Sequence, residues 1–145
     1  MEIKLIRSED ITDIFPLLSQ LNKNTPHDIL LERIKKMPGP NYECVGIYDQ
    51  EQLIGICGLW YSMRHYSGYS AEPDHVFIDE KYRNQGLGKK LFDWISQYCK
   101  EKGVEALELN TYTGNRKSHK FYTQEDFEIY GFHFVKIIRN DGIFY

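Results

Sequence analysis

The chain has 145 residues, of which 41% are hydrophobic and 27% charged, and its net charge is −3. A chain of this length can bury a core without a disulfide or a metal, so we expect one folded domain over residues 1–145. The acidic balance argues against a nucleic-acid partner. The lack of an 18-residue apolar run or a cleavable leader argues against a membrane partner and predicts a cytoplasmic protein.

The N-terminal part predicts one strand followed by two helices. Residues 3–7 alternate between apolar and polar side chains, as a half-buried strand does. Apolar residues at helical spacing then predict a helix that Ser8 caps and that Pro16 kinks or breaks. Pro26 suits the first position of a second helix, and the Pro-Gly-Pro sequence at residues 38–40 ends it.

The middle of the chain predicts antiparallel strands. Residues 42–48 and 53–61 are rich in apolar and aromatic side chains, and a short polar turn joins them into a hairpin. A polar and aromatic loop at 64–68 follows, and residues 71–79 form the next strand.

The C-terminal half predicts helices and strands in alternation. An amphipathic helix that begins near residue 88 stops at Gly103. A strand at 106–110, a helix at 115–124 and a strand at 127–138 follow. We therefore expect one mixed α/β domain, with antiparallel neighbours on one side of the sheet and parallel neighbours on the other.

The most informative motif lies between strand 71–79 and the helix after it. Arg83-x-x-Gly86-x-Gly88 lets backbone N–H groups approach an anion at a helix N-terminus, which suits a pyrophosphate. A dinucleotide-binding fingerprint would need a third glycine where Leu91 stands. A P-loop would need an earlier glycine and a hydroxyl residue where Lys90 stands, so both nucleotide readings fail.

A second motif lies downstream, where residues 115–122 read Asn-Arg-Lys-Ser-His-Lys-Phe-Tyr. With the glycine motif, it resembles the GCN5-related N-acetyltransferase (GNAT) superfamily over essentially the whole chain. Ser118 replaces the usual alanine, and Asp126 replaces a glycine that commonly precedes Phe127, although aspartate tolerates a left-handed turn. The resemblance implies a single α/β domain whose mixed central sheet has splayed fourth and fifth strands and is flanked by helices.

The resemblance implies that acetyl-CoA is the cosubstrate and lies where these two strands separate. Three strand residues would pair with the pantetheine arm through their backbones: Val76, Phe77 and Ile78. The loop amides would hold the pyrophosphate, with Lys89 in reach: Arg83, Asn84, Gln85, Gly86, Leu87 and Gly88. Asn115 would hydrogen-bond the pantetheine arm, and Tyr122 would lie beside the cofactor sulfur.

The reaction implied is direct attack of an amine on the thioester. A lysine-like amine has a pKa of about 10.4 and must lose a proton before it attacks. Strand alternation places Glu72, Asp74 and Val76 on one face. By resemblance to the superfamily's histone acetyltransferases, Glu72 is the general base, with Asp74 or a water chain as alternatives. Tyr122 is the expected general acid for the leaving thiolate.

No metal is expected, since none of the five histidines forms a His-x-x-x-His or Glu-x-x-His pair. Alternation places His75 on the face opposite Glu72, which indicates a structural role. An aromatic cluster around the loop before strand 71–79 is the expected acceptor pocket: Trp60, Tyr61, His65, Tyr66 and Tyr69.

The acceptor is expected to be a primary amine of a small molecule or a peptide. Two alternatives stay open: an acetyl-CoA-binding sensor or regulatory domain without catalysis, and an enzyme that uses a longer acyl group. The bulk of Trp60, Phe77 and Phe121 disfavours the latter. The resemblance also leaves a homodimer open.

Overall fold

The computed structural model describes residues 1–144. Its contacts divide the chain into two units, Met1–Leu109 and Asn110–Tyr145. The first unit holds the sheet and three α-helices, and the second holds α4 (Arg116–Gln124). None of the helices within residues 1–144 combines the length and the apolar composition that a bilayer crossing needs.

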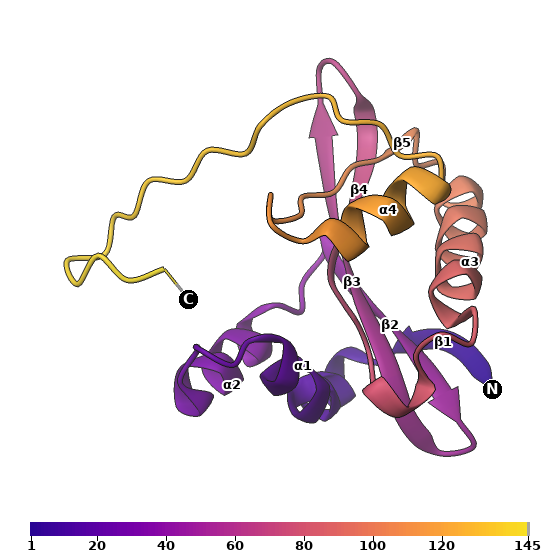
Figure 1. The fold of residues 1–145 in the computed structure, drawn as a ribbon, viewed down its shortest axis with the longest axis horizontal. Helices are drawn as coiled ribbons and strands as arrows, with labels where there is room; N and C mark the ends of the chain where they lie inside the picture. Colours follow the sequence, from indigo (N-terminus) through magenta and orange to yellow (C-terminus); the bar gives the residue numbers. More distant parts are fainter. Residues whose placement is uncertain (145) are drawn as a thin grey trace. The chain divides into compact units, whose positions relative to one another are not determined.

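The first unit is built on a five-stranded sheet whose spatial order follows the sequence (Figure 1). The strands are β1 (Glu2–Ile6), β2 (Tyr42–Asp49), β3 (Gln52–Arg64), β4 (Gly68–Ile78) and β5 (Ala106–Leu107). The first four are antiparallel neighbours, and β5 runs parallel to β4. The mixed sheet predicted from the sequence is confirmed.

Short turns explain why β2, β3 and β4 follow one another in the sheet. Gln50 and Glu51 connect β2 to β3, and Gln50 adopts a positive φ of 55°, which suits a tight hairpin. Residues 65–67 connect β3 to β4, so these strands are longer than the alternation predicted. The predicted strand 106–110, in contrast, pairs over only two residues as β5.

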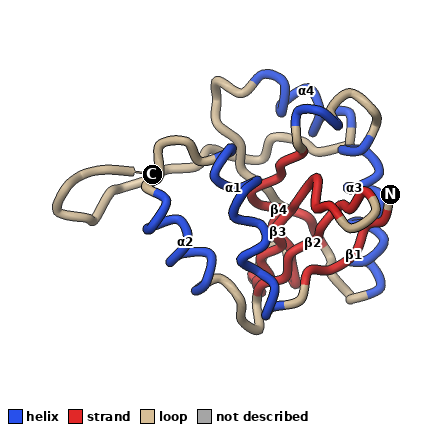
Figure 2. The backbone as a smooth tube through the Cα atoms, turned by 90° about the horizontal axis from the view of Figure 1, so that it is seen from below, coloured by secondary structure: helices blue, strands red, loops and turns tan. Residues whose placement is uncertain are grey.

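One face of the sheet is covered by the N-terminal helices, of which the first departs from prediction (Figures 1 and 2). The expected helix from Ser8 is a 3₁₀ segment, η1 (Ser8–Ile14), followed by α1 (Phe15–Leu21). Pro16 causes the break, because it has no N–H for an interior helical bond and fits only a first turn. Ser8 is not the N-cap, since that position belongs to Arg7.

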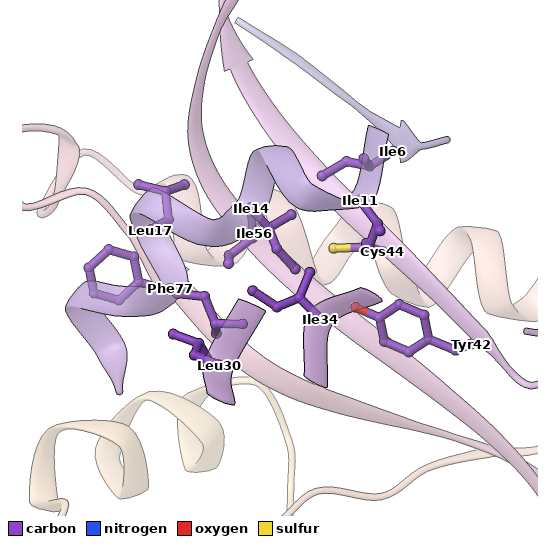
Figure 3. Packing of buried hydrophobic residues seen from close by; sticks show 11 residues of the cluster. Ile6, Ile11, Ile14, Leu17, Leu30, Ile34, Tyr42, Cys44, Ile56 and Phe77 are labelled. Atoms are coloured by element: carbon purple, nitrogen blue, oxygen red, sulfur yellow. The ribbon is translucent and has the colours of Figure 1, made fainter. Parts of the chain in front are cut away.

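The second helix is α2 (His27–Lys36), and Pro26 takes its N-cap position instead of the first helical one. Leu30 and Ile34 of α2 pack with Ile14 of η1 against Ile56 and other buried residues of the sheet (Figure 3). Each such aliphatic side chain contributes roughly 1.5–3 kcal/mol relative to exposure.

The opposite face is covered by α3 (Leu87–Glu101) (Figure 2). Leu91, Ile95 and Cys99 lie one helical turn apart and are buried against the sheet. Gly103 follows the C-cap with a φ of 78°, which confirms it as the stop signal of the helix. The sheet therefore lies between two layers of helix, and its central strands are buried on both faces.

In the second unit, Asn115 is the N-cap of α4, and its side chain accepts a hydrogen bond from the N–H of Ser118. The predicted strand 127–138 is wrong for the structure as described, because these residues lie outside any helix or strand. Apolar alternation shows which face a strand would bury. It does not supply the neighbouring strand that backbone N–H and C=O groups require.

Candidate active site

β5 pairs with only a short part of β4. β5 pairs with β4 through Ser70–Ala106 and Ala71–Leu107. Beyond these pairs β4 continues as Glu72–Ile78, with no strand of residues 1–144 on that side. This confirms the predicted splaying of the fourth and fifth strands. Backbone groups on such an edge need hydrogen-bond partners, so the edge can bind an extended ligand that carries amides.

The glycine motif connects this edge to a helix N-terminus. After β4 the chain forms a 3₁₀ turn, η2 (Glu80–Tyr82), and then enters α3 through Gly86. Gly86 is the N-cap of α3 with a φ of 74°, a left-handed conformation that glycine adopts without strain. A Cβ atom built on Gly86 would meet nothing within 4 Å, so the backbone here is open to approach. An anion can therefore reach the first amides of α3.

The basic side chains of the motif are held by local contacts. Arg83 donates from Nε to the carbonyl oxygen of Ile78 at 2.8 Å, pairs with Glu80 at 3.1 Å and stacks on Phe77. Lys89 pairs with Asp93 at 2.7 Å. Arg83 thus ties the loop to the end of β4, and the backbone is the part of the motif that is open to a ligand.

β4 contains a bulge that the sequence did not reveal. Gly58 of β3 pairs with Asp74, but Ile56 pairs with Phe77, so β4 has one extra residue between these pairs. His75 lies in the bulge with a φ of 38°, which is rare for a residue with a side chain.

The bulge reverses the alternation of side chains along β4. Phe77 packs in the core under α1 and α2 (Figure 3). Val76 and Ile78 pack on the α3 side. The prediction that Val76 shares a face with Glu72 and Asp74 is therefore wrong. The extra residue shifts every side chain after it to the other face.

Glu72 and Asp74 do share a face, as predicted. Glu72 pairs in register with Trp60, which packs against the core under α1 and α2. Asp74 accepts a hydrogen bond from Trp60 Nε1 at 3.3 Å. The two carboxylates therefore lie on the face of β4 that α1 and α2 cover, on either side of Pro73.

His75 lies on this face as well, and its predicted position opposite Glu72 is wrong. Its Nδ1 is 3.2 Å from Asp74 Oδ2, and its Nε2 is 3.1 Å from the hydroxyl of Tyr42. The imidazole is 8% exposed, whereas the Asp74 side chain is 55% exposed. Tyr42 and Trp60 pack ring against ring at 4.5 Å. The structure thus joins Tyr42, Trp60, Asp74 and His75 into one cluster.

The cluster controls the charge of Asp74. The hydrogen bond from His75 holds the pKa of the Asp74 carboxyl below its ordinary value, although partial burial raises it, and the bond from Trp60 lowers it further. Burial raises the pKa of the Tyr42 phenol, so Tyr42 stays neutral. Sequence reasoning did not find Tyr42. The only local signal was Gly58, a glycine inside an apolar strand, which often marks a bulge or a close contact.

The predicted aromatic acceptor cluster is divided between two faces of the sheet. Trp60 lies against Tyr42, whereas Tyr61 stacks on Tyr69 at 5.8 Å and packs on the α3 side. Neighbouring residues of a strand point to opposite faces, so Trp60 and Tyr61 cannot line one pocket. The prediction of a single pocket from these residues is wrong.

In the second unit, Tyr122 lies on α4 with its ring against Phe121 and Phe127, at centroid distances of 5.4 and 5.7 Å. Asp126 has a φ of 63°, which confirms that aspartate supports the left-handed turn usually made by glycine. Asn115 uses its side-chain oxygen as the cap of α4. Their assignment to one site with Glu72 and Asp74 stays a prediction.

Comparisons with known proteins identify the family and the fold. The sequence pattern of the acetyltransferase (GNAT) family matches residues 9–127. An aminoalkylphosphonate N-acetyltransferase of Salmonella typhimurium is 22% identical over 140 residues, which cover 94% of this chain and 91% of that protein.

Two solved structures have the same fold. A possible acetyltransferase from Clostridium difficile 630 superposes with a TM-score of 0.81 at 18% identity, covering 95% of this chain and 98% of that chain. AAC(6')-Iy, solved with the bisubstrate analogue CoA-S-monomethyl-acetylneamine, also gives a TM-score of 0.81, at 17% identity and with 95% and 97% covered. At these identities the structures establish the fold alone.

Proposed function

The chain belongs to the acetyltransferase (GNAT) family, and on this premise we propose that it is an N-acetyltransferase that moves the acetyl group of acetyl-CoA to a primary amine of a small molecule or a peptide. One observation supports this most directly. The edge of β4 beyond Glu72, which pairs with no strand of residues 1–144 on that side, leads through one loop to the N-terminus of α3. An edge that pairs with amides, followed by a helix N-terminus that attracts an anion, matches the pantetheine arm and the pyrophosphate of acetyl-CoA.

The residues present fit this cosubstrate. Val76, Phe77 and Ile78 lie on the open edge and would pair with the pantetheine amides through their backbones. The pyrophosphate would lie on the loop amides at Gly86, where the space beside Cα is open. Lys89 would reach the phosphates by leaving Asp93, which costs little because an exposed ion pair contributes at most about 1 kcal/mol.

When bound, acetyl-CoA supplies an acetyl group activated as a thioester. The acceptor arrives mostly as an ammonium ion and must give up a proton before its nitrogen can attack. We assign Glu72 to take this proton, directly or through a water, because Glu72 and Asp74 share one face of β4. A backbone N–H at Phe77 or Ile78 would stabilise the oxyanion that forms on the carbonyl.

We assign Tyr122 to the leaving thiolate. A phenol can donate a hydrogen bond or a proton to sulfur, and Tyr122 ends the Asn115–Tyr122 motif on α4. Asn115 would contact the pantetheine arm with its side-chain NH₂ group, since its oxygen already caps the helix. We further propose that residues 1–145 form one catalytic domain, because the family match extends across residue 109.

The acceptor would be a small or peptide amine, and the comparisons suggest which amines to test first. Purified protein is incubated with acetyl-CoA and an aminoalkylphosphonate, neamine or a lysine-containing peptide, and free thiol release is recorded. Mass spectrometry identifies the acetylated product. Thiol release that depends on the amine supports the proposal. Binding of acetyl-CoA without any acetylated amine would favour a sensor or regulatory domain. Faster turnover of a longer acyl-CoA than of acetyl-CoA would favour an enzyme that uses a longer acyl group.

A further inference from the structure

His75 has a backbone conformation that is unusual for a residue in a strand. It occupies the bulge with a φ of 38° and is the only residue within β4 (Gly68–Ile78), glycine excepted, with a positive φ. Its ring fills the space beside Gly58, and a Cβ atom there would lie 2.0 Å from Cε1 of the imidazole. Strained residues of this kind persist only where the surrounding structure holds them, and they concentrate at functional sites.

Two hydrogen bonds to Asp74 end on the same carboxylate oxygen. Trp60 Nε1 and His75 Nδ1 both contact Oδ2 of the carboxylate, at 3.3 and 3.2 Å. A carboxylate only accepts hydrogen bonds, so Nδ1 of His75 must carry a proton. The other ring nitrogen, Nε2, contacts the hydroxyl of Tyr42 at 3.1 Å, so the ring is held from both sides.

We propose, given the transfer reaction proposed above, that His75 is a positioning residue: with Trp60 it holds Oδ2 of Asp74, and so leaves Oδ1 to orient the acceptor amine. The buried imidazole fixes the rotamer of a side chain that is itself 55% exposed. An exposed aspartate without these bonds would sample several rotamers, and a hydrogen-bond acceptor must lie in one place to orient a nucleophile.

The same arrangement gives the carboxylates of Asp74 and Glu72 different roles. The bond from His75 keeps the pKa of Asp74 below its ordinary value, so Asp74 stays ionised and is a weak base. Asp74 therefore accepts a hydrogen bond from the amine, and Glu72 takes the proton. The other ionisable group that contacts the ring is the phenol of Tyr42. Burial raises the pKa of Tyr42, so it remains neutral.

Two substitutions at residue 75 separate positioning from packing. His75→Asn places an amide nitrogen near the position of Nδ1, and asparagine tolerates a positive φ. His75→Gln places its nitrogen nearer the position of Nε2, so it retains the contact with Tyr42 and loses the one with Asp74. Tyr42→Phe is the matched control, because it removes the bond to Nε2 without touching the bond to Asp74.

The first readout is the pKa of the Asp74 carboxyl, followed by NMR titration, which needs no turnover. We expect it to rise in His75→Gln toward the ordinary aspartate value and to stay near wild type in His75→Asn and Tyr42→Phe. Trp60→Phe, which removes the second donor to Oδ2, is expected to raise it less. If His75→Gln does not fold, Trp60→Phe and His75→Asn still test the assignment.

The second readout is steady-state kinetics with the amine that the wild-type protein acetylates fastest among the aminoalkylphosphonate, neamine and the peptide. We expect His75→Gln to lower kcat/KM for the amine by roughly tenfold or more, with the KM for acetyl-CoA unchanged and recovery in His75→Asn. An active wild type with equal amine kinetics and equal Asp74 pKa in His75→Gln would overturn this inference alone. A wild type that binds acetyl-CoA but acetylates no amine would overturn it together with the proposed function.

Discussion

The imidazole of His75 occupies the space that a side chain at Gly58 would need: a Cβ atom at residue 58 would lie 2.0 Å from Cε1 and 2.5 Å from Nε2 of the ring. Because the ring is buried, it cannot simply turn away into solvent. The bulge in β4 and the glycine in β3 therefore depend on each other.

Gly58→Ala is expected to lower the free energy of unfolding by about 1–3 kcal/mol, the usual cost of forcing extra atoms into a packed interior. Urea denaturation measures the change. Gly39→Ala is the control, because a Cβ atom there would meet nothing within 4 Å. Equal unfolding midpoints for the two variants would mean that the His75 ring has another place to go.

Gly86→Ala is expected to weaken acetyl-CoA binding by tenfold or more, measured by calorimetry, because a methyl group would enter the space through which the pyrophosphate approaches. Alanine is also strained at a φ of 74°, and this strain costs roughly 1–2 kcal/mol of stability. Gly103→Ala carries the same strain at the other end of α3, at a φ of 78°, and should leave affinity unchanged. Equal affinity in the two variants would remove Gly86 from the cofactor site.

Glu43 of β2 joins α3 to the sheet, because it accepts hydrogen bonds from Tyr98 of α3 at 3.0 Å, from Lys102 just after α3 at 2.9 Å and from Tyr61 of β3 at 2.7 Å. Burial raises the pKa of the Glu43 carboxyl, but the bonds from Tyr61, Lys102 and Tyr98 outweigh it and hold the pKa below its ordinary value of 4.5. The unfolded chain therefore binds this proton at a higher pH than the folded chain. Glu43 contributes fully to the free energy of unfolding at pH values above 4.5, and this contribution is lost as pH falls through the lower pKa that Glu43 has in the folded chain.

Glu43→Gln is accordingly expected to lower the free energy of unfolding by about 1–3 kcal/mol at pH 7. The difference from wild type should shrink as pH falls below 4.5. Urea unfolding at several pH values measures it. Glu2→Gln, which removes an exposed pair with Lys4, is the control and should change little. A difference that stays constant down to pH 3 would contradict the role given to the Glu43 charge.

Glu72→Gln is expected to lower kcat by roughly 100-fold, the scale of losing a general base, while acetyl-CoA affinity stays the same. Asp74→Asn should act differently: its single amide oxygen would take the bonds from Trp60 and His75, and its NH₂ group cannot accept a hydrogen bond from the amine, so the main effect should be a higher KM for the amine. Kinetics across pH distinguish the two. Full activity in both variants would place the base elsewhere.

Tyr122→Phe retains the ring and its contact with Phe127 but removes the hydroxyl. We expect turnover to fall by roughly 10- to 1000-fold, about 1.4–4 kcal/mol of transition-state stabilisation, with acetyl-CoA affinity unchanged. Tyr112→Phe, another tyrosine of the same unit, is the control. Equal turnover in both, with chemistry rate-limiting, would reduce Tyr122 to a packing residue.

Local patterns in the sequence determined much of this protein. The glycine motif, the 115–122 motif, the hairpin, the stop at Gly103 and the turn at Asp126 each depend on residues close together in the chain. Short-range sterics and hydrogen bonding decide such features, so they can be predicted from residue types and spacing. The family and the open edge beside β5 followed from the two motifs.

Tertiary structure decided what depends on pairing between distant segments. One extra residue at His75 reversed the faces of Val76 and Phe77 and brought Tyr42, Trp60 and Asp74 around the imidazole. Alternation within β4 could not show this, because the register is set by β3 and by the absence of a side chain at Gly58. For the same reason β5 is short and residues 127–138 did not form the predicted strand: a strand exists only where a partner's backbone meets it.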